Sequence, residues 1–158
     1  MTRAFVGIGA NLGDPVAQVR SAIAALAALP QTRLVAASSL YRSAPLGFTA
    51  QADFVNAACL FETALAPREL LSHLHAIEAA AGRERRFKDA PRTLDLDLLL
   101  YGADTIDEPG LAVPHPRLHE RAFALAPLVE LDPDAVIPGR GPAREWLARA
   151  GAQRVERL

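Results

Sequence analysis

The stretch Arg92-Thr-Leu-Asp-Leu-Asp-Leu-Leu-Leu-Tyr101 sets two aspartates into an apolar run. Its leucines predict a buried strand from Leu94 to Leu100. Because side chains alternate between the faces of a strand, Asp95 and Asp97 share one face. The other face is expected to carry Leu94, Leu96, Leu98 and Leu100. Two neighbouring carboxylates repel each other unless a cation lies between them, and their hard oxygen atoms suit Mg²⁺. The alternative is the solvated outer face of an ordinary amphipathic strand.

Length and composition indicate one soluble domain over residues 1–158. The chain is 51% hydrophobic and 22% charged, which is ordinary for a globular protein. A net charge of −1 gives no general attraction to nucleic acid or to an anionic membrane. The single cysteine, Cys59, excludes an internal disulfide and fits a reducing compartment. The start of the chain lacks the apolar core of a signal peptide, and no run approaches the about 20 apolar residues of a membrane span. We therefore expect a cytoplasmic protein.

Hydrophobic periodicity predicts alternating strands and helices. Strands are expected at 3–9, 34–41, 53–62 and 94–100, with short strand pieces between 104 and 113. Helices are expected at 15–29, from Pro67 to a stop at Gly82, at 118–131 with a kink or division at Pro127, and at 142–150. This order favours an α+β fold, a ferredoxin-like antiparallel sheet with helices packed on its faces.

The predicted strand at 53–62 pairs an aromatic ring with an amide. Phe54 and Asn56 fall on one face, and Val55, Ala57 and Cys59 on the other. A ring beside an amide can hold a flat heterocycle by stacking and hydrogen bonding. An ordinary edge residue and a turn-proximal asparagine are the alternative from this strand alone. The segment Gly9-Ala-Asn-Leu-Gly13 is explained by a tight strand-to-helix turn.

A run of cations precedes the aspartate strand. Residues 83–92 hold five, among them Arg83 and Arg92. Such a run is usually a solvated loop. Beside a magnesium site, however, guanidinium groups are how proteins hold polyphosphate. His115, between two prolines, is conformationally restricted and able to donate to a phosphate, although a structural histidine is the default.

Together these motifs resemble the 6-hydroxymethyl-7,8-dihydropterin pyrophosphokinase family over essentially the whole chain. The matching residues are Gly9-Ala-Asn-Leu-Gly13, Tyr41-Arg-Ser-Ala-Pro-Leu-Gly47, Phe54-Val-Asn56, Glu78 with Gly82-Arg83, Pro91-Arg-Thr-Leu-Asp-Leu-Asp97, Val113-Pro-His115 and Arg121-Ala-Phe123. The resemblance implies transfer of pyrophosphate from ATP to the pterin hydroxymethyl group, with release of AMP, in folate biosynthesis.

The resemblance also implies a role for each matching residue. Asp95 and Asp97 would bind two Mg²⁺ ions and, with Arg83 and Arg92, form the catalytic set. The pterin would contact Ser43, Ala44, Leu46, Phe54, Asn56 and Phe123. ATP would contact His75, Glu78, Arg83, Arg92, His115 and Arg121. The implied partners are these two small molecules, with no nucleic acid or membrane, and we expect a monomer.

Two positions depart from the family pattern. Asp89-Ala90-Pro91-Arg92 stands where many members have Trp-Gly-Pro-Arg, so Phe87 is the nearest candidate to replace that tryptophan. Gly110 stands where some members have a basic residue. Two other functions remain alternatives at this point: a magnesium-dependent phosphohydrolase, and a ferredoxin-like nucleotide-binding module without catalysis.

Overall fold

The structure is a computed structural model that describes residues 1–46, 50–82 and 94–158. Its first part follows the predicted order of strands and helices, except that two strands replace the one expected at 34–41. The elements are β1 (Thr2–Ala10), α1 (Pro15–Ala27), β2 (Thr32–Ala37), β3 (Tyr41–Ser43), β4 (Phe54–Thr63), α2 (Pro67–Ala80) and β5 (Asp95–Tyr101). Helix α1 begins where the sequence predicts, because the Asp14 side chain accepts a hydrogen bond from Ala17 N and Pro15 occupies the first turn.

The second part is built from shorter elements. They are β6 (Ile106–Glu108), β7 (Leu111–Val113), the 3₁₀ helix η1 (Leu118–Glu120), α3 (Ala122–Leu131), β8 (Val136–Ile137), β9 (Gly141–Pro142), α4 (Ala143–Arg149) and β10 (Val155–Arg157). None of the described helices is both long and apolar enough to cross a bilayer.

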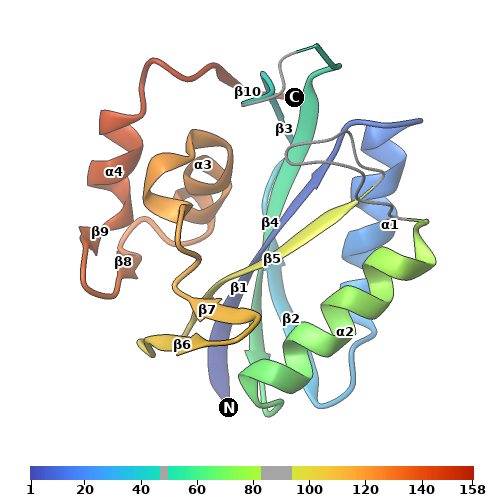
Figure 1. The fold of residues 1–158 in the computed structure, drawn as a ribbon, viewed down its shortest axis with the longest axis vertical. Coiled ribbons are helices and arrows are strands. Elements are labelled where there is room, and N and C mark those ends of the chain that lie inside the picture. Colours follow the sequence, from blue (N-terminus) through green and yellow to red (C-terminus); the bar gives the residue numbers. More distant parts are fainter. Residues whose placement is uncertain (47–49, 83–93) are drawn as a thin grey trace.

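The main sheet is antiparallel, with the order β10-β3-β4-β1-β5 and with β2 also paired to β4. Helices α1 and α2 cover one face of this sheet, and α3 and α4 lie on the other (Figure 1). The prediction of an α+β fold with an antiparallel sheet is confirmed. Two separate apolar clusters result, one on each face.

The single strand predicted at 34–41 is wrong, because the structure has two strands there. Strand β2 pairs with the end of β4, and β3 pairs with its beginning. Between them, Ser38 interrupts the ladder: its backbone N–H donates to Ala58 O, but Ala58 N donates to the Ser38 hydroxyl, each at 2.8 Å. A side chain therefore replaces a backbone acceptor at the break.

A β-bulge in β5 corrects the predicted facing of Leu100. Val6 pairs with Leu98 but Phe5 pairs with Leu100, so Leu99 is an extra residue in the strand. Leu94, Leu96 and Leu98 pack in the cluster under α1 and α2, as predicted, whereas Leu100 packs in the cluster under α3. The alternation of side chains between the two faces fails to predict Leu100, because it assumes an unbroken pairing register between β5 and β1.

The helix predicted at 118–131 is divided at Arg121 and not at Pro127. Arg121 has an extended backbone (φ −116°, ψ 103°) between η1 and α3, and α3 continues through Pro127. The short strands β8, β9 and β10 were not predicted.

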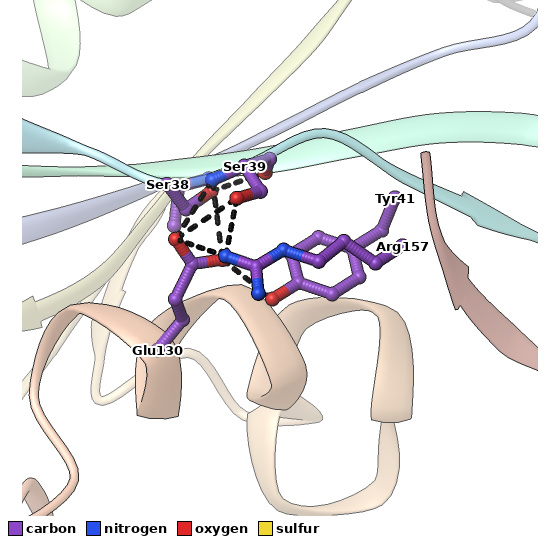
Figure 2. A network of polar contacts seen from close by, with 6 residues as sticks. Ser38, Ser39, Tyr41, Glu130 and Arg157 are labelled. Atoms are coloured by element: carbon purple, nitrogen blue, oxygen red, sulfur yellow. Dashed lines mark hydrogen bonds and ion pairs between the residues drawn. The ribbon is translucent and has the colours of Figure 1, made fainter.

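A partly buried polar network joins α3 to the sheet (Figure 2). The Glu130 carboxylate accepts hydrogen bonds from Ser39 N (2.9 and 3.1 Å) and from the Tyr41 hydroxyl (2.5 Å), and lies 3.3 Å from Arg157. Burial alone raises the pKa of Glu130, but these hydrogen bonds and the charge of Arg157 together lower it. Burial, then the hydrogen bond to Glu130, raises the pKa of Tyr41 to about 12.

Candidate active site

A cavity of about 250 Å³ lies between the sheet and the start of α3. It is lined by residues of β1, β3, β4 and β5 on one side and of α3 and the segment before it on the other. Nine residues predicted from the sequence line it: Ser43, Ala44, Leu46, Phe54, Asn56, Asp95, Asp97, Arg121 and Phe123. The structure therefore brings together side chains that lie as much as 80 residues apart in the chain.

The wall formed by β1 contains two glycines, one on either side of Ile8. Gly7 and Gly9 both line the cavity. A Cβ added at Gly9 would lie 3.1 Å from Asn56 Nδ2, and one added at Gly7 would lie 3.2 Å from a methyl carbon of Leu99. Gly9 lies inside β1, so the strand-to-helix turn explains Gly13, with φ +64°, but not Gly9. Gly9 gives the Asn56 amide room for a close approach, because a Cβ at this position would force the amide to shift by a few tenths of an ångström.

The amide of Asn56 is buried and oriented. Asn56 is 3% exposed and Ser43 is 2% exposed. The Ser43 hydroxyl donates to Asn56 Oδ1 at 2.5 Å. This bond occupies the amide oxygen, and no other described residue accepts a hydrogen bond from Nδ2. A buried donor of this kind costs free energy unless a ligand satisfies it.

Two phenyl rings and one guanidinium complete this part of the cavity. Phe54 comes from β4, on the same face as Asn56, as predicted, while Phe123 comes from α3. The guanidinium carbon of Arg121 lies 5.5 Å from the centre of the Phe123 ring, in cation–π range. The arrangement offers apolar ring faces beside a positive charge.

The carboxylate pair of β5 lies at the same cavity, with His115 beside it. His115 Nε2 is 3.8 Å from Asp97 Oδ1. His115 is held by two backbone bonds, from its own N–H to Leu99 O (3.0 Å) and from Arg117 N to its Nδ1 (3.1 Å). Because Nδ1 accepts, the proton of the neutral ring is on Nε2, which faces the carboxylate.

Burial lowers the pKa of His115 to about 4, with the positive charges of Arg121 and Arg117 adding to the effect and Asp95 opposing it. At neutral pH His115 is therefore an uncharged N–H donor at this position. It is not among the cavity-lining residues, but it is in contact range of one of them.

Two predicted nucleotide-binding residues lie elsewhere. His75 is exposed on α2, and Glu78 is buried in the same helix; neither lines the cavity. Glu78 Oε2 accepts a hydrogen bond of 2.8 Å from Leu96 N, so it supports the backbone between the two aspartates. Arg83 and Arg92, like Phe87 and Asp89, lie outside the described residues.

Among the charged residues that line the cavity, the sequence analysis missed one, Arg117. Arg117 lines the cavity and pairs with Glu120, its Nε 3.4 Å from Oε2. The sequence signal was the segment Pro114-His-Pro-Arg117, from which only the histidine was selected.

The donor set suits a hard divalent cation. Within the described ranges no group of three or more His, Cys, Asp or Glu residues could hold a metal ion on its own. Mg²⁺ does not need such a group, because it binds through one or two carboxylates together with waters and substrate phosphates. Asp95 and Asp97, which share one face of β5 and open onto the cavity, fit this requirement.

The fold and the cavity define an α+β domain in which two phenyl rings, a buried amide and a carboxylate pair line one cavity. Solved structures share this fold: an HPPK-DHPS protein in complex with substrates (TM-score 0.75, 12% identity) and a Plasmodium falciparum HPPK-DHPS triple mutant (TM-score 0.74, 12% identity). The alignments cover 94% of this chain but only 43% and 44% of those longer chains.

Sequence comparison identifies the family. Residues 5–133 match the model of 7,8-dihydro-6-hydroxymethylpterin-pyrophosphokinase (HPPK). The chain is 46% identical over 156 residues to the 2-amino-4-hydroxy-6-hydroxymethyldihydropteridine pyrophosphokinase of Pseudomonas aeruginosa, covering 99% of this chain and 96% of that one. It is 44% identical over 158 residues to the enzyme of the same name from Methylorubrum extorquens, covering 100% and 99%. The chain belongs to the HPPK family. The family and the enzyme class predicted from the sequence, an ATP-dependent pyrophosphokinase of folate biosynthesis, are confirmed.

Proposed function

We propose that the cavity is the place where this chain transfers pyrophosphate from ATP to the hydroxymethyl group of 6-hydroxymethyl-7,8-dihydropterin. The observation that carries the proposal is the juxtaposition of a buried, oriented Asn56 amide with the carboxylate pair in one cavity of about 250 Å³. Neither a phosphohydrolase nor a binding module without catalysis requires an acceptor pocket beside the metal ligands.

In this proposal the pterin ring lies between Phe54 and Phe123, with the Asn56 Nδ2 donating to an acceptor on the ring edge. Ser43 orients that amide, and Ala44 and Leu46 close the same side. A ring between two phenyl faces buries apolar area, and the amide adds discrimination, because a ligand without the acceptor leaves a buried donor unpaired.

The phosphates of ATP lie at the other end of the cavity. Asp95 and Asp97 would hold Mg²⁺, and two ions are expected. When bound, the metal would neutralise the negative charge of the phosphates. Arg121 and Arg117 present positive charge from the facing wall. His115, neutral, would donate from Nε2. From sequence alone, Arg83 and Arg92 are assigned to the phosphates, and His75 and Glu78 to the nucleotide side.

The reaction requires positioning more than acid–base chemistry. The hydroxymethyl oxygen attacks the β-phosphorus, the bond from that phosphorus to the bridging α–β oxygen breaks, AMP leaves with the oxygen, and the hydroxyl proton is released. Among the residues described at the cavity, no side chain is an obvious general base at this oxygen. We therefore assign catalysis to alignment of the two substrates and to charge stabilisation by arginines and metal.

The test is AMP formation from ATP, with and without the pterin, in the presence of Mg²⁺. We expect AMP only when both substrates are present. Turnover of the Asp97→Ala variant should fall more than about a hundredfold, and the variant should remain folded. Asp107→Ala is the matched control, because Asp107 is an exposed aspartate on β6 that does not line the cavity. Phosphate release without pterin, or full turnover in Asp97→Ala, would contradict the assignment.

We further propose that the protein is a monomer located in the cytoplasm and that it binds neither nucleic acid nor membranes. The near-zero net charge supports the last two statements. Light scattering coupled to gel filtration measures the mass directly, and a mass of two or more chains would contradict the monomer.

A further inference from the structure

The break at Arg121 is held by a side chain from the far end of the chain. The Gln153 amide spans it: Oε1 accepts from Ala122 N at 3.0 Å, and Nε2 donates to Glu120 O at 2.7 Å. Both backbone groups lie directly beside Arg121. The first N–H groups of a helix need partners from outside the helix, and no side chain at the Arg121 N-cap of α3 provides one. Gln153 therefore acts as the cap of α3 from outside.

The two residues after Gln153 contact the opposite wall of the cavity. Arg154 forms an ion pair of 2.8 Å with Asp53, the residue before Phe54. Val155 begins β10 and pairs with Ser43 in β3. Three consecutive residues thus join the wall that carries Arg121 and Phe123 to the wall that carries Phe54 and Ser43. Figure 1 shows β10 beside β3, at the end of a segment that comes from α4.

We propose that the segment 153–155 is a positioning element that sets the separation and orientation of the two walls of the cavity, with Gln153 as the positioning residue for Arg121 and Phe123. This inference rests on the proposed function of the cavity. The segment lies outside residues 5–133, the part that matches the family model. Gln153 does not line the cavity, so it acts through the backbone on each side of Arg121.

The geometry explains why a single amide is effective. Phe123 lies two residues after the break and Arg121 lies in it, so a rotation of the backbone there moves both side chains. A glutamine presents one acceptor and one donor, which matches one N–H and one C=O, whereas a carboxylate matches only the N–H. Misplacement of a binding group by about 1 Å can cost about a hundredfold in rate.

The experiment compares Gln153→Met, which removes both hydrogen bonds at similar length, with Gln153→Glu, which keeps the acceptor and loses the donor. We expect Gln153→Met to raise the KM for pterin about tenfold, equivalent to about 1.4 kcal/mol, with a smaller change in kcat. The KM for pterin of Gln153→Glu should lie between the values of Gln153→Met and the wild type.

The matched control is Thr32→Val. The Thr32 hydroxyl also makes two hydrogen bonds, to Pro30 O (2.8 Å) and with the Thr63 hydroxyl (2.7 Å), but at the end of β4 opposite Phe54. We expect this variant to lose comparable thermal stability with unchanged KM values. An equal pterin KM in Gln153→Met, Thr32→Val and the wild type would overturn the inference.

Two further results complete the test. If Gln153→Met does not fold, Arg154→Ala tests the other contact of the segment, since removal of an exposed ion pair costs little stability. It should raise the pterin KM about threefold, and a wild-type KM would count against the inference. A wild-type chain that forms no AMP refutes the proposed function, whereas normal turnover with unaffected position-153 variants refutes only the positioning role.

Discussion

The substitution Gly9→Ala tests how closely the proposed ring-binding site is packed. The added Cβ would lie 3.1 Å from Asn56 Nδ2 and 4.0 Å from Phe54 Cδ1. The first distance is shorter than an ordinary van der Waals contact, so the amide has to shift by a few tenths of an ångström. Because Asn56 Oδ1 is held by Ser43 at 2.5 Å, that shift strains or breaks the bond that orients the amide.

The expected magnitude follows from the cost of overpacking, about 1–3 kcal/mol for an added methyl group in a well-packed site. At about 1.4 kcal/mol for each factor of ten, the KM for pterin should rise about fivefold to about 150-fold. The free energy of unfolding should fall by less than this strain, because replacing glycine by alanine in a strand itself gains about 0.5–1 kcal/mol.

The assay measures AMP formation at saturating ATP with varied pterin, together with the melting temperature. Gly7→Ala is the control. Gly7 is in the same strand and lines the same cavity, but its Cβ would meet the flexible end of Leu99 at 3.2–3.4 Å instead of the amide. We expect Gly7→Ala to change the KM for pterin much less. A wild-type KM in Gly9→Ala would refute the role of Asn56 in ring binding.

Two predictions concern stability. Tyr41→Phe removes the hydrogen bond to the Glu130 carboxylate (2.5 Å) and should reduce the free energy of unfolding by about 1.5–3 kcal/mol at pH 7. Because the pKa of Glu130 is lowered in the folded state, this loss is complete above the ordinary carboxyl pKa and shrinks as pH falls through the folded-state value. Urea unfolding from pH 7 to 3 measures it, and Tyr101→Phe, which loses a bond to a neutral backbone carbonyl, should show no such trend. Glu78→Ala leaves the buried Leu96 N–H without its acceptor. It should lower the free energy of unfolding by about 1–3 kcal/mol and should also lower turnover. An unchanged free energy of unfolding would show that another group replaces the carboxylate.

The period-two and helical patterns were sufficient to predict the elements that carry the site. They placed Asp95 with Asp97 and Phe54 with Asn56 because these pairs lie two apart in continuous strands. They failed at Leu100, since a bulge depends on the register of the partner strand, which a single segment does not reveal. They also failed to predict β10, a three-residue edge strand that exists through its pairing with β3.

The residues that the sequence analysis missed were missed for a common physical reason. Arg117 is one of many charged loop residues, which are usually solvated, and only the folded cavity distinguishes it. The sequence pattern assigned Gly9 to a turn. The contact that favours glycine there is with the amide of Asn56, 47 positions later in the sequence, and no local pattern reveals it. The role of Gln153 depends on two backbone groups of another segment. Residues whose purpose is a long-range backbone contact leave no local pattern.

The sheet has a further consequence for how this family can diverge. It separates the cluster packed under α1 and α2 from the face that carries the cavity, and side chains such as Val19, Leu70 and Leu74 pack only in that cluster. Substitutions there are shielded from the substrates by a layer of backbone. We therefore expect homologous sequences to differ most among the apolar residues packed under α1 and α2. Substitutions on the opposite face should be fewer, because selection for the reaction acts there.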